Sequence, residues 1–196
     1  MSTVLPAHDV HLKGERVHLR PFAEADFEAV VRWWDDPEVM DYAEGKEDPH
    51  YSREEIEGIY RGTVEKWEAL LFIIEVGGAA IGETWLQRMN MARSHKQPPD
   101  RAWRIDIMIG EKASWGKGFG REAVGLLLRH AFEDLGAHRV AAMCVFEFNE
   151  RSLRMFRACG MREVRRVPDL VERGGRKFAE VDLEITRAER VARADL

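Results

Sequence analysis

Apolar residues follow two periods along the chain, and their alternation predicts a mixed α/β fold. Helix-like spacing, with apolar residues three or four positions apart, extends over 24–35, 52–67 and 124–135 and returns after Asn149. Between these segments, dense or alternating apolar runs predict strands. The predicted strands are 17–21, 70–76, 79–86, 103–109, 139–145, 161–167 and 177–186. The predicted order is therefore β-α-α-β-β-β-α-β-α-β-β, without an internal repeat or a domain linker.

Turn and capping residues mark where these elements begin and end. The pair Asp36-Pro37 predicts the end of the first helix, because the residue before a proline avoids the α region. Ser52, followed three residues later by Glu55, predicts the capping box of a second helix. Gly77-Gly78 separates two strand-like runs and predicts a hairpin turn. The polar segment 88–100 predicts a loop, either beside a site or simply on the surface.

Composition indicates an ordinary globular chain. Its 196 residues are 45% hydrophobic, and we expect one domain over 1–196 with a core at about 15–187. The formal net charge of −5 argues against a nucleic-acid partner, and it suits a cationic substrate as well as ordinary solubility. Cys144 and Cys159 form neither a disulfide framework nor a metal cluster. Because no signal peptide or membrane span is found, we expect a cytoplasmic protein with no membrane partner.

The most informative segment is the run Trp115-Gly116-Lys117-Gly118-Phe119-Gly120-Arg121, between a predicted strand and a predicted helix. Alternate glycines let the backbone turn tightly and let a ligand approach the main chain closely. A helix N-terminus adds free N–H groups and the positive end of the helix dipole, so the segment predicts a phosphate or diphosphate site. The Walker A spacing is missing, and Arg121 occupies the third glycine position of the dinucleotide fingerprint, which argues against both of those motifs.

Four segments together resemble the GNAT superfamily of acyl-CoA-dependent N-acetyltransferases. They are Asp36-Pro37-Glu38-Val39, Ala80-Ile81-Gly82, 115–123 and 149–161, and the resemblance extends from Val17 to Thr186. It implies an α/β single domain whose central, mostly antiparallel sheet is splayed between its fourth and fifth strands and flanked by helices. It also implies acetyl-CoA as the cosubstrate and no metal.

The resemblance implies which residues bind acetyl-CoA. The amides of the glycine loop would hold the diphosphate, and the strand before it would pair with the pantetheine arm. The implied cofactor-binding residues are Ile107, Met108, Ile109, Trp115, Gly116, Lys117, Gly118, Phe119, Gly120, Arg121, Asn149 and Phe156. Trp115 stands where Gln or Arg is commonest in the family, and Phe156 stands where many members have a proton-donating tyrosine. Asn149 is equally suited to be a helix N-cap.

Direct attack of an amine on the acetyl thioester needs a base, and two acidic residues are candidates. Asp106 is a charge within an apolar strand, and it resembles the aspartate that faces the substrate amine in aminoglycoside 6′-N-acetyltransferases. Glu83, in a neighbouring strand, is the second candidate. Either residue is also open to a purely structural role as a paired acid. Trp33, Trp34 and Trp85 are candidates for the acceptor pocket, with Trp34 expected in the core and Trp33 exposed.

These features predict an acetyl-CoA-dependent N-acetyltransferase that acts on a primary amine. Asp106 and the acidic balance favour a small cationic or aminoglycoside-like amine. The loop at Trp115 resembles the ribosomal-protein N-terminal acetyltransferase branch and favours a protein N-terminus. The alternative is a non-catalytic acyl-CoA-binding or regulatory module, which the absence of a tyrosine at Phe156 favours. We expect a small-molecule or peptide acceptor and no nucleic-acid or membrane partner, and a homodimer is left open.

Overall fold

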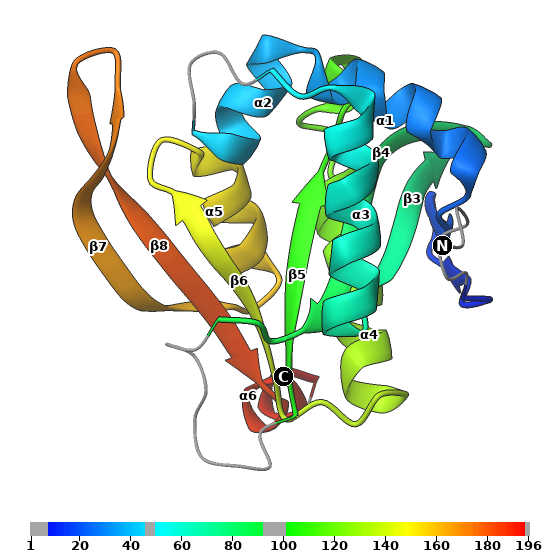
Figure 1. Ribbon diagram of the computed structural model, residues 1–196. Coiled ribbons are helices and arrows are strands. Elements are labelled where there is room, and N and C mark those ends of the chain that lie inside the picture. Colours follow the sequence, from blue (N-terminus) through cyan, green and yellow to red (C-terminus); the bar gives the residue numbers. More distant parts are fainter. Residues whose placement is uncertain (1–7, 46–49, 92–100, 195–196) are drawn as a thin grey trace.

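An eight-stranded sheet forms the centre of the computed structural model, which describes residues 8–45, 50–91 and 101–194 (Figure 1). The strand order is β1-β2-β3-β4-β5-β6-β8-β7. Neighbouring strands are antiparallel except β5 and β6, which are parallel. The strands are β1 (Leu12–Lys13), β2 (Val17–Pro21), β3 (Leu70–Val76), β4 (Ala79–Arg88), β5 (Ala102–Met108), β6 (Arg139–Phe146), β7 (Arg162–Arg173) and β8 (Arg176–Thr186).

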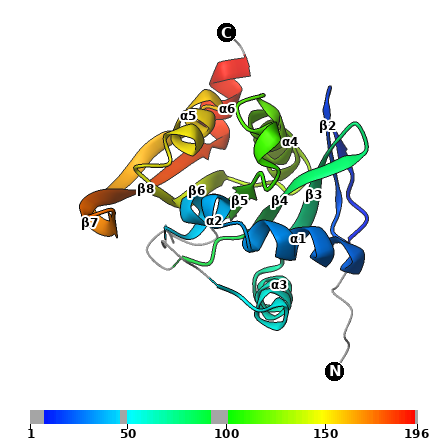
Figure 2. The same cartoon turned by 90° about the horizontal axis from the view of Figure 1, so that it is seen from above.

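Helices cover both faces of this sheet. Figure 2 shows α4 and α5 on one face and α1 and α3 on the other. The helices are α1 (Phe27–Trp34), α2 (Pro37–Glu44), α3 (Arg53–Trp67), α4 (Phe119–Glu133), α5 (Glu150–Ala158) and α6 (Arg187–Ala194), with 3₁₀ turns at Glu24–Asp26 and Lys112–Ser114. Within the described ranges, no helix has the length and apolar character needed to cross a membrane.

Two hydrophobic clusters attach the helices to the sheet. The first joins α4 and α5 to the strands and includes Val124, Leu127 and Phe156. The second joins α1 and α3 to β3 and includes Trp34 and Tyr60. The apolar stripes predicted from helical spacing are therefore confirmed, and each pair of helices packs its stripe on a different face of the sheet.

β5 and β6 diverge partway along their length. They pair only from Ala102↔Arg139 to Arg104↔Ala141. Beyond this point, residues 106–108 of β5 pair with β4 alone in the part of the chain that the structure describes. The strand β6 has a bulge around Cys144, whose φ is +59°. Because β5 and β6 are the fourth and fifth predicted strands, the splayed sheet is confirmed. The divergence leaves one edge of β5 free to pair with a ligand.

Two glycines near the end of β5 let neighbouring groups lie close to their backbone. A Cβ added at Gly82 would lie 2.2 Å from the carbonyl oxygen of Met108. A Cβ added at Gly110 would lie 2.1 Å from Cγ of Trp33. The expectation that Trp33 is exposed is therefore wrong, because its indole packs over the bare backbone of Gly110 and is 2% exposed. Its Nε1 donates a hydrogen bond to Glu111 Oε1 (2.8 Å).

The sequence prediction is incomplete at Asp36-Pro37, where it placed only the end of a helix. α1 ends at Trp34, but α2 begins at once with Pro37. Asp36 caps α2, because its Oδ1 accepts hydrogen bonds from the N–H groups of Glu38 (3.0 Å) and Val39 (3.4 Å). Proline suits the first helical position, since its missing N–H has no intrahelical partner there. The pair therefore ends one helix and starts another.

Other predicted boundaries agree with the structure. Ser52 and Glu55 form both hydrogen bonds of the capping box of α3. Gly77 and Gly78 have φ of +59° and +81° and join β3 to β4 in an antiparallel hairpin. Most of the loop predicted over 88–100 lies outside the described residues. The structure adds β1, which is too short to give an apolar pattern, and α6, which is mostly polar.

Candidate functional site

The glycine loop turns sharply between β5 and α4. Gly116 and Gly118 have φ of +73° and +86°, in the left-handed region that favours glycine. Gly118 is the N-cap of α4 and offers no side chain to cap its first turn. The N-terminal N–H groups of this 15-residue helix therefore face the loop without a side-chain cap, which suits an anionic ligand.

A cavity of about 400 Å³ lies along this loop and is called here the loop groove. Its walls are the glycine loop, the end of β5, α2 and the first turns of α4 and α5. The predicted cofactor-binding residues that line it are Ile107, Met108, Ile109, Trp115, Gly116, Gly118, Phe119, Gly120, Arg121 and Asn149. Lys117 is not among the lining residues, and its carbonyl accepts a hydrogen bond from Arg16 Nη1 (3.1 Å). Uncapped amides beside a free strand edge fit a diphosphate followed by an amide-bearing arm.

Asn149 combines the two roles that the sequence left open for it. Its Oδ1 accepts a hydrogen bond from the N–H of Ser152 (3.2 Å), so it caps α5. Its Nδ2 donates to the carbonyl oxygen of Tyr42 (3.1 Å), which joins α5 to α2 across the groove. The residue thus lines the groove and also holds together two of its walls.

A second cavity of about 320 Å³, called here the inner cavity, adjoins the loop groove. The two cavities share Tyr42, Ala43, Ile107, Met108, Asn149 and Ser152. They therefore meet where β5 and β6 diverge. The inner cavity is lined by carboxylates and aromatic rings, including the predicted Trp34 and Trp85 but not Trp33.

Glu83 lies at the wall of the inner cavity, surrounded by aromatic donors. Trp34 Nε1 donates to its Oε1 (3.1 Å), and Trp85 Nε1 donates to its Oε2 (3.2 Å). The hydroxyl group of Tyr60 donates to the same Oε2. Burial raises the pKa of the Glu83 carboxyl from 4.5 to about 7, against the lowering effect of the two indole hydrogen bonds. The carboxylate can therefore exchange a proton near neutral pH.

Asp106 lines the same cavity but is held in an ion pair. Its Oδ1 accepts hydrogen bonds from Arg104 Nη2 (2.5 Å) and Nε (3.1 Å), and its Oδ2 accepts one from Gln87 Nε2 (2.7 Å). Arg104 also donates to Asn90 Oδ1 (3.2 Å). The charge of this predicted catalytic residue is thus compensated by a neighbour on its own strand, unlike that of Glu83.

Phe156 lies at the position where the resemblance implies a tyrosine. It is 3% exposed, packs in the first core cluster, and lines the inner cavity but not the loop groove. The phenylalanine side chain has no proton that it can donate. The family's usual proton donor is therefore replaced by an apolar wall.

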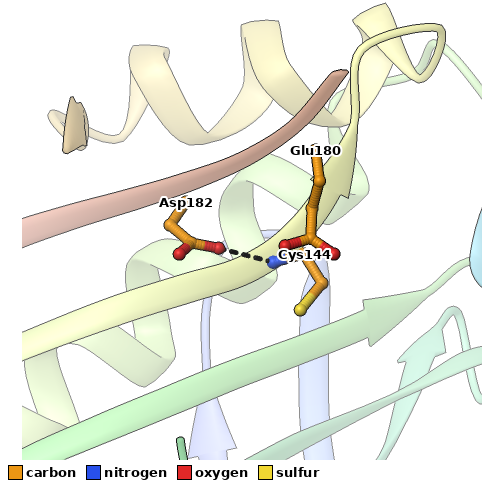
Figure 3. Close-up of side chains that lie close together, drawn as sticks. All are labelled: Cys144, Glu180 and Asp182. Atoms are coloured by element: carbon orange, nitrogen blue, oxygen red, sulfur yellow. Dashed lines mark hydrogen bonds between the residues drawn. The ribbon is translucent and has the colours of Figure 1, made fainter. Parts of the chain in front are cut away.

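Three potential metal ligands lie close together beside the bulge of β6. Cys144 Sγ and carboxylate oxygens of Glu180 and Asp182 lie within 4.8 Å of one another (Figure 3). Asp182 Oδ1 accepts a hydrogen bond from the N–H of Cys144 (2.9 Å). Arg165 Nη1 donates to Glu180 Oε1 (3.1 Å) and Asp182 Oδ2 (3.3 Å). The two carboxylates therefore already share a guanidinium, which accounts for the cluster as an ion-pair network.

Sequence reasoning missed the residues that α2 and α5 add to the loop groove. They are Val39, Tyr42, Ala43, Arg151, Ser152, Arg154 and Met155. The α2 residues were missed because Asp36-Pro37 was interpreted only as a stop signal. An Asp N-cap followed by proline at the first helical position is also a start signal, and it would have placed Tyr42 on a helix.

Comparisons with a family model and with solved structures agree with the fold described above. Residues 16–162 match a family model described as an acetyltransferase (GNAT) domain. A spermidine N-acetyltransferase from Vibrio cholerae in complex with CoA and spermine has a similar fold, with 21% identity, a TM-score of 0.75, and coverage of 91% of this chain and 99% of that chain.

Two further solved structures extend the comparison. A putative acetyltransferase from T. thermophilus has 26% identity and a TM-score of 0.71, with coverage of 96% of this chain and 95% of that chain. An aminoglycoside acetyltransferase in complex with coenzyme A has 17% identity and a TM-score of 0.72, with coverage of 90% and 98%. Since the family model spans the glycine loop and both strands of the divergence, this chain belongs to the GNAT acetyltransferase family.

Proposed function

We propose that the protein transfers the acetyl group of acetyl-CoA to a small cationic primary amine. The observation that carries this proposal is the meeting of the loop groove and the inner cavity where β5 and β6 diverge. A diphosphate at the start of α4 directs a linear arm along the free edge of β5. The thioester would then reach Ile107 and Met108, which line both cavities, and an amine in the inner cavity would face it.

The charges and rings of the inner cavity support a cationic acceptor. Among the described residues that line it, the carboxylates are Glu44, Glu83 and Asp106, and the guanidinium is that of Arg104. Carboxylates and aromatic faces both attract ammonium groups. The enzymes with similar folds include one that acts on spermidine and one that acts on aminoglycosides, both of which are cationic amines. This composition favours such acceptors over a protein N-terminus.

Glu83 is the base that the geometry favours. The attacking amine must be neutral, and its nitrogen bonds to the thioester carbon as the carbon–sulfur bond breaks. With a pKa of about 7, the Glu83 carboxylate can take up the amine proton near neutral pH, whereas Asp106 is held in an ion pair with Arg104. Asp106 and Arg104 then form part of the polar wall that orients the acceptor. The leaving thiolate takes its proton from water, because Phe156 offers none.

The test is release of free thiol from acetyl-CoA in the presence of spermidine, an aminoglycoside and a short peptide with a free N-terminus. We expect turnover with a small cationic amine and none with the peptide. Turnover with the peptide alone would support the N-terminal acetyltransferase alternative. Tight binding of CoA by calorimetry, with no turnover on any of these amines, would support the non-catalytic module that Phe156 favours.

A further inference from the structure

The guanidinium of Arg151, near the start of α5, lies against two aromatic rings at the loop groove. Its Cζ is 3.9 Å from the centroid of the Trp115 ring and 4.4 Å from that of the Tyr42 ring. The two rings are nearly perpendicular, at 87°, so the cation occupies the corner between them. All three residues line the groove together with the glycines of the loop.

The Trp115 ring is itself held in place. Its Nε1 donates a hydrogen bond to the carbonyl oxygen of Ile109 (2.7 Å), which fixes the indole to the chain that leads from β5 into the loop. Tyr42 is fixed from the other side, because its carbonyl oxygen accepts a hydrogen bond from Asn149. The rings therefore hold the Arg151 guanidinium at a defined place beside the glycine loop.

The described part of the chain does not compensate the charge of Arg151. In the ranges that the structure describes, no carboxylate pairs with it and no acceptor takes a hydrogen bond from it. The other two arginines of α5 differ, since Arg154 pairs with Glu150 (2.9 Å) and Arg157 pairs with Glu163 (3.3 Å). Aromatic contacts hold a guanidinium without consuming its N–H donors. Arg151 therefore presents unused donors and a full positive charge to the groove.

We propose that Arg151 binds the diphosphate of the cosubstrate from the side opposite α4, on a platform made by Trp115 and Tyr42. The inference rests on the proposed function, since it assigns a residue to the same groove. A guanidinium recognises paired phosphate oxygens better than a point charge does, because its N–H groups form a planar fork. The first position of the glycine loop is the uncharged Trp115 in this chain. Arg151 on α5 would supply the positive charge that this position lacks.

Calorimetric titration of CoA and of dephospho-CoA, which keeps the diphosphate but lacks the 3′-phosphate, tests this assignment. The variant is Arg151→Gln, which keeps a planar side-chain end and removes the charge at an exposed position. The matched control is Arg157→Gln on the same helix, also exposed and outside the groove. We expect Arg151→Gln to weaken both ligands by about 10- to 100-fold, and the control to stay within about twofold.

A salt titration adds a measurement that a structural role would not change. Between low and high ionic strength, the wild type should lose affinity for CoA more steeply than Arg151→Gln, because a charge pair is screened. Unchanged CoA affinity in Arg151→Gln would overturn the assignment. A loss for CoA but not for dephospho-CoA would also overturn it, since Arg151 would then contact the 3′-phosphate. Failure of the wild type to bind CoA would instead contradict the proposed function itself.

Discussion

The hydroxyl group of Tyr60, on α3, donates a hydrogen bond to Oε2 of Glu83, on β4, in the interior of the protein. Tyr60 is 0% exposed and Glu83 is 4% exposed. Burial disfavours the charged carboxylate, whereas the indoles of Trp34 and Trp85 favour it, and the phenol donates a further hydrogen bond to it. The balance between these effects sets the pH at which Glu83 is ionised, and therefore the pH range in which it could serve as the proposed base.

The pH dependence of turnover should follow the ionisation of Glu83. Below about pH 7 the Glu83 carboxyl is protonated and cannot accept a proton, so kcat/KM should fall. Protonation of the amine itself adds to this fall. Tyr60→Phe removes a donor to the charged form, and the fall should therefore move to higher pH. Initial rates between pH 5.5 and 9 measure this. Tyr51→Phe, whose hydroxyl contacts Glu44 instead, is the control, and an equal displacement in it would contradict the assignment.

Glu83→Gln should lower turnover by about 100-fold or more, since a positioned general base contributes on that order. Its affinity for CoA should be retained, because Glu83 does not line the loop groove. Steady-state rates and calorimetry on the same preparation separate the two effects. Near wild-type turnover would remove Glu83 from the mechanism.

The stability of the protein should also depend on pH through Glu83. In the unfolded chain this carboxyl loses its proton near pH 4.5, but in the folded protein it keeps the proton up to about pH 7. The folded state binds more protons between these values, so the free energy of unfolding should fall as the pH rises. Since one pKa unit corresponds to about 1.4 kcal/mol, the fall is about 3 kcal/mol. Urea denaturation at several pH values should show this fall in the wild type and a smaller one in Glu83→Gln.

Asp106→Asn should lower kcat/KM for the amine more than it lowers cofactor affinity. The substitution leaves the Arg104 charge without its carboxylate beside the inner cavity, which disfavours a cationic acceptor. We expect a rise in KM for the amine of about tenfold, and a Kd for CoA within about twofold of the wild type. An unchanged KM and kcat would mean that Asp106 is only a structural partner of Arg104.

Gly118→Val should abolish measurable CoA binding. Valine is strained at a φ of +86°, and its side chain would lie at the N-terminus of α4, where the diphosphate is proposed to bind. Gly125→Ala is the matched control, because a Cβ there meets open space in the same helix and should stabilise it by about 1 kcal/mol. Calorimetry with CoA and thermal unfolding would distinguish loss of binding from loss of fold.

Gly110→Ala should destabilise the protein by about 2 kcal/mol or more, because the new Cβ overlaps the buried Trp33 ring. The effect should appear as a lower midpoint of denaturation, whereas Gly125→Ala should not lower it. A stable Gly110→Ala variant that keeps its activity would mean that the indole of Trp33 can be displaced at little cost.

Local signals predicted most of the fold because they act through neighbouring residues. The capping box of Ser52, the hairpin glycines Gly77 and Gly78, and the apolar stripe of α4 are read within a few positions of the chain. The Asp36-Pro37 pair shows the limit of such reading, since the same dipeptide ends α1 and starts α2. Whether a second helix follows the first depends on whether its turns can pack against the rest of the protein, and that depends on distant residues.

The sequence by itself determined the order of the elements with a clear apolar pattern, the glycine loop and the family, because these depend on spacing along the chain, but it missed β1, α2 and α6. Only the tertiary structure decided how the acidic residues differ. Asp106 is compensated by Arg104, whereas Glu83 meets donors from α1, α3 and β4 that lie far apart in the sequence. It likewise brought Arg151 to the rings of Trp115 and Tyr42. The charge and proton affinity of a group are set by what surrounds it in space, and spacing along the chain does not contain that information.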